Sequence, residues 1–256
     1  RDSLRTIANM YKASQSDYQD PPLGSGINPY HFVMSLSQHL CDNHLIICGD
    51  ATACIVPFQV MPIHRNQRMF SNSGCASMGY DLPAGLGAAL AARDSSMSAP
   101  ALILAGDGSI MMNLQELQTL ASSNLDILLV ILDNNGYLSI KQTQSNFFGR
   151  EHGASPESGV TFPDFVLIAR AFGLPVTYLE DAESMRLSLE SIISDQTGPR
   201  VCVVKLFDKQ EFQPRLKSKL VDGMISTPEL DDMFPHLPDE ELLSIRGFLT
   251  DATDLH

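Results

Sequence analysis

The chain alternates short runs rich in Val, Ile and Leu with segments of helical length, and this alternation limits the possible folds more than any other feature of the sequence. Strands are expected at 45–48, 101–105, 127–132, 176–179 and 201–206, and helices at 29–41, 82–93, 114–123, 163–172 and 184–194. Strands that are apolar on both faces must be covered on both faces. The pattern therefore predicts an α/β fold, a doubly wound parallel sheet with helices on both faces.

The sequence divides into three parts by composition. Residues 1–28 mix polar residues with prolines and glycines and read as a linker from a missing upstream region, since the chain opens on Arg1 rather than Met. Residues 29–207 carry the strand and helix pattern and form the expected compact domain. Prolines and acidic residues punctuate residues 208–256, which predicts an extended C-terminal tail with at most short helices.

Charge and composition narrow the class of partner. The formal net charge of -13 and the pI near 4.8 disfavour nucleic acid and anionic membranes, because both attract clustered Lys and Arg. No apolar run is long enough to span a membrane. The five cysteines lack close metal-binding spacings, which indicates free thiols in a reducing cytosol. We therefore expect a cytoplasmic protein with a small-molecule site.

Two predicted strands end in polar and small residues. The first continues into Gly106-Asp107-Gly108-Ser109 and the second into Asp133-Asn134-Asn135-Gly136-Tyr137. A crossover helix lies between them and is expected to begin at Asn113, as an Asn cap with Glu116 three residues on. Because a βαβ unit returns the chain beside itself, Asp107 and Asn134 should face one another. A carboxylate, an amide oxygen, a backbone carbonyl and phosphate oxygens suit Mg²⁺.

Gly-Asp-Gly alone predicts only a turn, but the two segments together are more specific. Their spacing resembles the cofactor-binding signature of thiamine diphosphate-dependent enzymes, the family of pyruvate decarboxylase and acetolactate synthase. In that signature Gly-Asp-Gly is followed at a distance by Asn-Asn. The resemblance implies thiamine diphosphate and Mg²⁺ as cofactors, with Asp107, Asn134 and the Gly136 carbonyl as metal ligands. Asp133 then replaces the first Asn, and Asn135 is the rival ligand.

A second segment, residues 73–89, resembles the small-residue stretch before this motif in acetolactate synthase, with Asp81 where a glycine is usual. The resemblance places Met78 beneath thiamine as the wedge that bends it, although a methionine can also simply fill a core. It also makes the Ala76 carbonyl an acceptor for the cofactor's 4′-amino group. Residues 49–52 match a third family loop more loosely, and a plain turn is an equal alternative there. The cofactor-binding residues implied are Gly49, Asp50, Ala51, Thr52, Ala76, Ser77, Met78, Gly106, Asp107, Gly108, Ser109, Asn134, Gly136 and Tyr137.

The glutamate that activates thiamine in this family belongs to a different domain, and no residue here matches it. Glu116 is expected to cap its helix instead. The resemblance, which covers roughly residues 29–206, therefore implies that the chain supplies the diphosphate and metal half of a site. A pyrimidine-binding domain would come from upstream sequence or from another subunit of a homodimer or homotetramer.

Residues 138–148 resemble the acetolactate synthase helix that lines the substrate pocket, with Thr143 in place of a Trp. This difference indicates a roomier pocket for an aldehyde, ketone or sugar-like acceptor. The expected activity is decarboxylation of a 2-oxo acid with carboligation to an acceptor. The alternatives are a simple 2-oxo acid decarboxylase and a non-catalytic cofactor-binding module. A nucleotide-binding Rossmann domain would need a Gly-x-Gly-x-x-Gly after its first strand, which is absent. The apolar residues of the tail suggest either a lid over the cofactor or packing along a sheet edge or subunit interface.

Overall fold

The structure is a computed structural model that describes residues 18, 20–96, 99–195, 197–215, 219–221, 224–227, 229, 232–234, 238, 240–244 and 246–247. It contains two compact units, Asp20–Gln210 and a smaller one composed of Arg1–Gln19 and Glu211–His256. Most of the expected linker, residues 1–17, lies outside the described residues. Residues 20–28, which the sequence pattern also assigned to the linker, lie within the larger unit. Ile27 there is 2% exposed, and its N–H donates to the Lys205 carbonyl at 2.8 Å.

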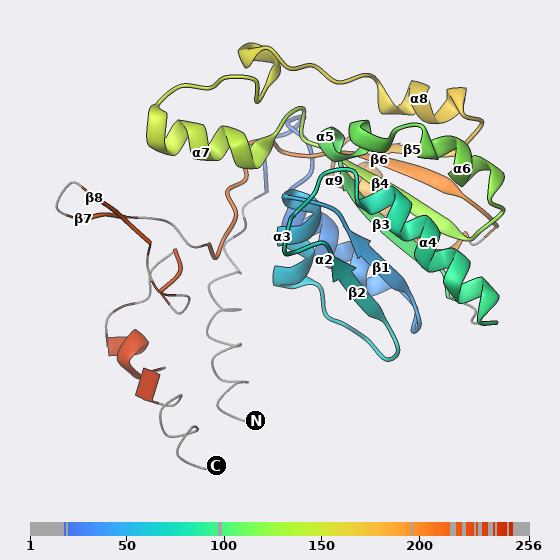
Figure 1. Cartoon of the computed structure of the whole chain (residues 1–256), viewed down its shortest axis with the longest axis horizontal. Helices are drawn as coiled ribbons and strands as arrows, with labels where there is room; N and C mark the ends of the chain where they lie inside the picture. Colours follow the sequence, from blue (N-terminus) through green and yellow to red (C-terminus); the bar gives the residue numbers. More distant parts are fainter. Residues whose placement is uncertain are drawn as a thin grey trace. The chain divides into compact units, whose positions relative to one another are not determined.

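The larger unit is built on a six-stranded sheet with the order β2-β1-β3-β4-β6-β5, in which every neighbouring pair is parallel. The strands are β1 (Leu45–Cys48), β2 (Arg68–Ser71), β3 (Ala101–Gly106), β4 (Ile127–Asp133), β5 (Val176–Leu179) and β6 (Arg200–Lys205). The two central strands, β3 and β4, are buried along almost their whole length. Because all six strands run parallel, their carboxyl ends lie at one edge of the sheet (Figure 1).

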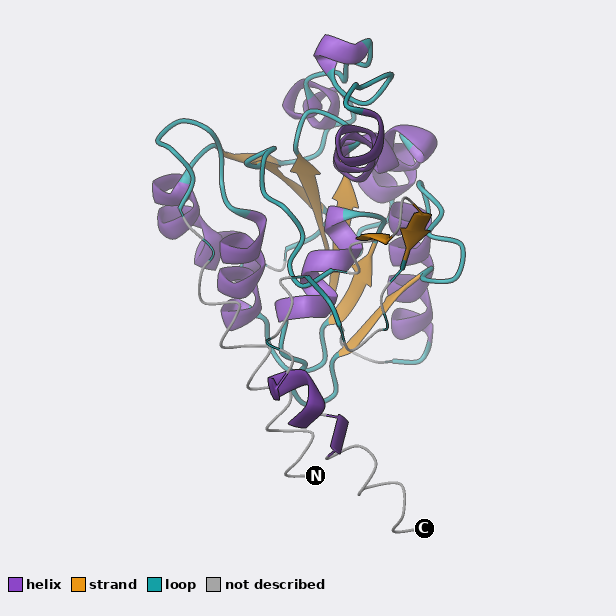
Figure 2. Cartoon of the chain, turned by 90° about the vertical axis from the view of Figure 1, so that its left-hand side faces the viewer, coloured by secondary structure: helices purple, strands orange, loops and turns teal. Residues whose placement is uncertain are grey.

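Helices cover both faces of this sheet, as Figure 2 shows. They are α2 (Pro29–His39), α3 (Thr52–Val60), α4 (Asp81–Asp94), α5 (Asp107–Ile110), α6 (Glu116–Ser122), α7 (Leu138–Phe148), α8 (Phe165–Ala171) and α9 (Ala182–Ser194), with short 3-10 turns η2 (Met111–Asn113) and η3 (Pro156–Ser158). Alternate strand residues such as Ile103 and Leu129 form one core with α4, α6 and α8. Helix α2 packs with α3 and α9 on the other face. The predicted doubly wound α/β fold is confirmed.

Several features differ from the sequence expectation. Helix α3 and edge strand β2 were not predicted. Asn113 does not cap the crossover helix, which begins at Glu116 without a side-chain cap. The side-chain amide of Asn113 donates instead to the Gly79 carbonyl at 2.6 Å. The expectation that Glu116 caps this helix is therefore also wrong, because Glu116 is its first residue. A tertiary contact has displaced a local capping preference.

The smaller unit contains paired strands, which the expectation of an extended tail with short helices did not include. Strands β7 (Lys219–Val221) and β8 (Met224–Ser226) pair antiparallel, and an isolated bridge joins Arg215 to Phe234. An Asp-Gly pair at 222–223 separates the two strands in the sequence, and this dipeptide is a strong hairpin signal that the proline pattern obscured. Within the described residues of both units, no helix combines the length and apolarity that crossing a bilayer requires.

Candidate functional site

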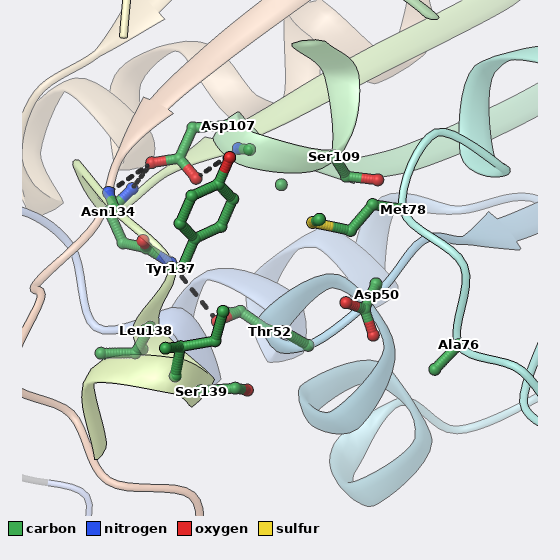
Figure 3. A pocket seen from close by; sticks show the side chains of 15 residues that line it. Asp50, Thr52, Ala76, Met78, Asp107, Ser109, Asn134, Tyr137, Leu138 and Ser139 are labelled. Carbon is green, nitrogen blue, oxygen red and sulfur yellow. Dashed lines mark hydrogen bonds between the residues drawn. The ribbon is translucent and has the colours of Figure 1, made fainter. Parts of the chain in front are cut away.

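A cavity of about 210 Å³ lies at the carboxyl ends of β1, β3 and β4, where a doubly wound sheet binds its ligands (Figure 3). It is lined by Asp50, Ala51, Thr52, Ala76, Met78, Gly106, Asp107, Gly108, Ser109, Asn134, Gly136, Tyr137, Leu138, Ser139 and Ile140. The sequence argument named these residues as cofactor-binding except the last three. Two residues it named, Gly49 and Ser77, do not line the cavity. Gly49 is buried, and Ser77 is exposed and accepts a 3.2 Å bond from the Asn72 amide.

The Asp107 carboxylate lies directly after β3, in the Gly106–Gly108 turn that lines one side of the cavity. It is 2% exposed, and its Oδ1 accepts a bond of 2.7 Å from the Gly108 N–H. Its Oδ2 accepts bonds from the N–H groups of Asn134 and Gly136, at 3.2 and 3.0 Å. Burial raises the pKa of Asp107 to about 7, although the three N–H groups oppose this rise. A bound cation would favour the charged carboxylate.

The amide of Asn134 is only partly satisfied. Its Nδ2 donates a long bond of 3.5 Å to the Thr52 hydroxyl, and its buried Oδ1 has no hydrogen-bond partner among the described residues. Buried acceptors without a partner are rare in folded proteins and call for an explanation such as a ligand or ion. Asn135, the rival, is exposed, and its N–H donates to the Asp133 carboxylate at 3.0 Å.

These groups fit a hard divalent cation. A carboxylate at 107, an unpartnered amide oxygen at 134 and a carbonyl at 136 are the oxygen donors that Mg²⁺ prefers. In the described part of the chain, no three His, Cys, Asp or Glu side chains form a cluster that could hold a metal. A cation here would therefore complete its coordination with oxygens from a ligand.

Two glycines let the backbone approach closely around this centre. A Cβ on Gly108 would collide with the ring of Tyr137, and one on Gly136 would collide with the Ala154 carbonyl oxygen. The Tyr137 ring also packs edge to face on Phe162, with 5.5 Å between ring centroids. The aromatic side chain therefore covers the Gly106–Gly108 turn from one side, and neither glycine tolerates a side chain.

The opposite side of the cavity is formed by two loops with strained backbone. Ala51, which precedes α3, has φ 49° and ψ −119°, and Ala76 has φ 47°. Non-glycine residues in this region are costly and persist where the surrounding structure over-determines them. Met78 is 38% exposed and its side chain lies at the cavity, so it does not simply fill the core (Figure 3).

Helix α7 carries the remaining cavity residues, within the segment 138–148 that the resemblance assigned to the substrate pocket and not to the cofactor. Its first turn, Leu138 to Ile140, lines the cavity, yet Leu138 is its only buried residue. Further along, the Gln144 amide bonds both backbone groups of His152, donating to the carbonyl at 3.1 Å and accepting from the N–H at 2.8 Å. Thr143 is exposed, and so is Phe148, at 71%. Only the resemblance pointed to this turn, because Leu138 and Ile140 carry no polar group that would have marked them as part of a site.

Comparison with known proteins agrees with this geometry. Residues 49–204 match the family model for the thiamine pyrophosphate enzyme C-terminal TPP-binding domain. The acetolactate synthase isozyme 1 large subunit of Escherichia coli is 29% identical over 73% of this chain and 32% of its own length. The acetolactate synthase large subunit of Parasynechococcus marenigrum is 34% identical over 52% of this chain and 21% of its own length. The chain thus spans a third or less of these relatives.

Solved structures show the same fold. A benzoylformate decarboxylase from Polynucleobacter necessarius aligns with a TM-score of 0.63 at 20% identity, over 72% of this chain and 34% of its own. A 4-hydroxybenzoylformate decarboxylase from Rhodococcus jostii aligns with a TM-score of 0.60 at 21% identity, over 73% of this chain and 34% of its own. From its matching domain and its fold, the chain belongs to the thiamine pyrophosphate-dependent enzyme family, within which it forms the C-terminal cofactor-binding domain.

Proposed function

We propose that the protein decarboxylates a 2-oxo acid and joins the resulting acyl unit to an acceptor, with this chain contributing the diphosphate and Mg²⁺ half of the site. The observation that carries the proposal is the buried, unpartnered Oδ1 of Asn134 beside Asp107, within a thiamine pyrophosphate-binding domain. When bound, thiamine diphosphate supplies a thiazolium ring that accepts the electron pair released as CO₂ leaves.

The residues of this chain would hold and orient the cofactor. Asp107, Asn134 and the Gly136 carbonyl would bind Mg²⁺, which neutralises the diphosphate. Met78 would support the bend of thiamine, and the Ala76 carbonyl would accept a hydrogen bond from its amino group. The strained backbone of Ala76 suits such a role, because a rigid acceptor loses little freedom when the cofactor binds.

The rest of the site would come from a pyrimidine-binding domain, either upstream or in another subunit of a homodimer or homotetramer. The cavity of about 210 Å³ supports this proposal, since small-molecule pockets usually measure roughly 300 Å³ or more. Apolar side chains near it are also exposed, including Met112 at 48% and Ile140 at 44%. We place the enzyme in the cytoplasm, where its five free cysteines would stay reduced.

Acetolactate synthases are among the relatives of this chain, which favours carboligation over simple decarboxylation. Thr143, which stands where the resemblance places a Trp, suggests a roomier pocket for an aldehyde, ketone or sugar-like acceptor. The acceptor would enter beside the first turn of α7, whose residues line the cavity.

Product analysis tests this function. The full-length protein would be incubated with pyruvate, thiamine diphosphate and Mg²⁺, with and without an added aldehyde, and the products followed by NMR. Carboligation predicts a hydroxyketone product together with CO₂. Acetaldehyde alone would identify a simple decarboxylase. Cofactor binding without any release of CO₂, from pyruvate or from larger 2-oxo acids, would identify a non-catalytic module.

A further inference from the structure

Three loops that border the cavity meet at one buried carboxylate, that of Asp81. Asp81 is the first residue of α4, and it is 0% exposed. A charged group held out of water is costly unless its surroundings compensate for it. Within the described residues Asp81 takes part in no ion pair, so its charge is stabilised by hydrogen bonds and by its place at the N-terminus of α4. Burial raises its pKa, while bonds from Ser109 and Leu82 lower it.

The Ser109 hydroxyl links Asp81 to two loops that border the cavity, the turn after β3 and the loop that contains Gly79. Ser109, at the turn after β3, donates its hydroxyl to Asp81 Oδ2 at 2.6 Å. The same Ser109 oxygen accepts a bond of 2.8 Å from the Gly79 N–H, directly after Met78. A third loop touches the carboxylate as well, because a Cβ on Gly49 would lie 2.5 Å from Asp81 Oδ2.

Gly79 is held at both of its polar groups by the chain that follows β3. Its N–H donates to Ser109, and its carbonyl accepts the bond of 2.6 Å from the Asn113 amide. Its φ of 80° and the closeness of the Met112 side chain leave no room for a Cβ. The peptide next to Met78 is therefore attached to the same turn that carries Asp107.

A simpler role for Asp81 would be to cap α4. Its Oδ1 does accept a bond of 2.8 Å from the Leu82 N–H at the start of that helix. Capping uses only one of the two carboxylate oxygens, however, and needs no burial. The other oxygen is committed to Ser109, which lies 28 residues away in the sequence.

We propose that Asp81 is a positioning residue: through the Ser109 hydroxyl it fixes Gly79, and with it Met78, relative to the Gly106–Gly108 turn. The inference rests on the proposed cofactor function, in which one end of the ligand is gripped at this turn and the other is bent over Met78. Relative motion of Met78 and the Gly106–Gly108 turn would destabilise the bent form of the ligand. The bonds from Asp81 through Ser109 to Gly79, here called the clamp, therefore contribute to preorganisation.

The first test needs no cofactor. Amide hydrogen exchange of the full-length protein would be measured for Gly79. Ser109→Ala and Asp81→Ala should each speed exchange about tenfold, the effect of losing one hydrogen bond that involves a charged group. Asp81→Asn keeps one acceptor oxygen where the structure uses two, so its Gly79 exchange should lie between the wild type and the alanine variants. Because both residues act on one path, the double alanine variant should match either single one.

A matched control separates positioning from capping. Asp181 caps α9 by accepting a bond of 2.8 Å from the Ser184 N–H, so Asp181→Ala should lose the same kind of helix cap that Asp81→Ala loses at α4. The rate of amide hydrogen exchange at Gly79 should be unchanged in Asp181→Ala. Unchanged Gly79 exchange in Ser109→Ala, or equal acceleration in Asp181→Ala, would overturn the proposal.

The second test compares two ligands on the full-length protein in the presence of Mg²⁺. Asp81→Ala should weaken binding of thiamine diphosphate by about tenfold while leaving the affinity for inorganic pyrophosphate unchanged. Equal weakening of both ligands would mean that Asp81 acts on the diphosphate turn itself, and the positioning role would be wrong. If the wild-type protein binds neither ligand, the proposed function fails, and the exchange of Gly79 alone decides the clamp.

Discussion

Asn134 and Asn135 carry the same side chain at the end of β4 but have opposite surroundings. Asn134 is 8% exposed and lines the cavity, with an amide oxygen that has no partner. Asn135 is exposed in the left-handed region, at φ 58°, which asparagine tolerates better than most residues. The backbone therefore directs only the first side chain into the cavity, where its amide donates to the Thr52 hydroxyl.

This difference gives a paired prediction. Asn134→Ala should weaken binding of thiamine diphosphate with Mg²⁺ by at least about tenfold, since it removes an oxygen ligand from a charged site. Asn135→Ala, its matched control, should change the affinity less than about twofold, as expected of a surface change. Titration calorimetry on the full-length protein measures both. A larger effect at 135 would move the metal-binding register by one residue.

The sequence could predict the polar half of the candidate site but not its backbone strain. The spacing of the two strand ends predicted that Asp107 and Asn134 would meet, and the structure brings them together. The sequence does not predict the positive φ of Ala51 and Ala76, because alanine normally avoids that region. The Asp81 to Ser109 bond was also out of reach, since it depends on how two distant loops pack.

At the scale of elements, α4 packs against the sheet through a glycine. A Cβ on Gly85 would collide with the Ile103 side chain on β3, whereas one on Gly87 would meet no atom within 4 Å. The two glycines stand two residues apart on one helix, so they lie on different faces of it.

Alanine substitutions should therefore act in opposite directions. Gly85→Ala should lower the free energy of unfolding by roughly 1–3 kcal/mol, because it overpacks the contact with Ile103. Gly87→Ala should raise it by about 0.5–1 kcal/mol, because alanine is the better helix former at an exposed position. Urea denaturation followed by circular dichroism measures both values. If both variants are destabilised, the contact of α4 with β3 is not the cause.

The elements that sequence predicted well are those whose signal is burial. β3 and β4 are apolar runs, and their positions agree with the expected ranges to within a residue. β2 is a short edge strand that begins with an exposed arginine, so it has no apolar run. Helix α3 contains Pro57, which reads as a helix breaker, and its apolar residues do not favour one face. Such elements are specified by packing rather than by local pattern.

For the molecule as a whole, ligand binding should appear as stability. Thiamine diphosphate with Mg²⁺ at about 100 times the dissociation constant should add roughly 2.7 kcal/mol to the free energy of unfolding of the full-length protein. A chelator should abolish this gain, because the diphosphate is held through the metal. Thiamine without its diphosphate should give little stabilisation. Scanning calorimetry measures the shift, and a gain that survives chelation would contradict the metal assignment.

A further prediction concerns the 256-residue chain on its own. With saturating cofactor and Mg²⁺ it should release no CO₂ from pyruvate, since the activating glutamate would lie in another domain. Supplying the pyrimidine-binding domain should restore turnover. Measurable release of CO₂ by the isolated chain would refute the half-site proposal, while its α/β fold would stand.

The mostly polar attachment of α7 also bears on how such enzymes diversify. This helix buries one leucine, and hydrogen bonds and an ion pair from Lys141, Gln142, Gln144 and Ser145 hold it, while most of its length is exposed beyond the sheet edge (Figure 1). Mutations along its outer face should therefore accumulate with little loss of stability. Natural selection could alter what enters the cavity without disturbing Asp107 or Asn134, so new substrate preferences can arise on an inherited chemistry.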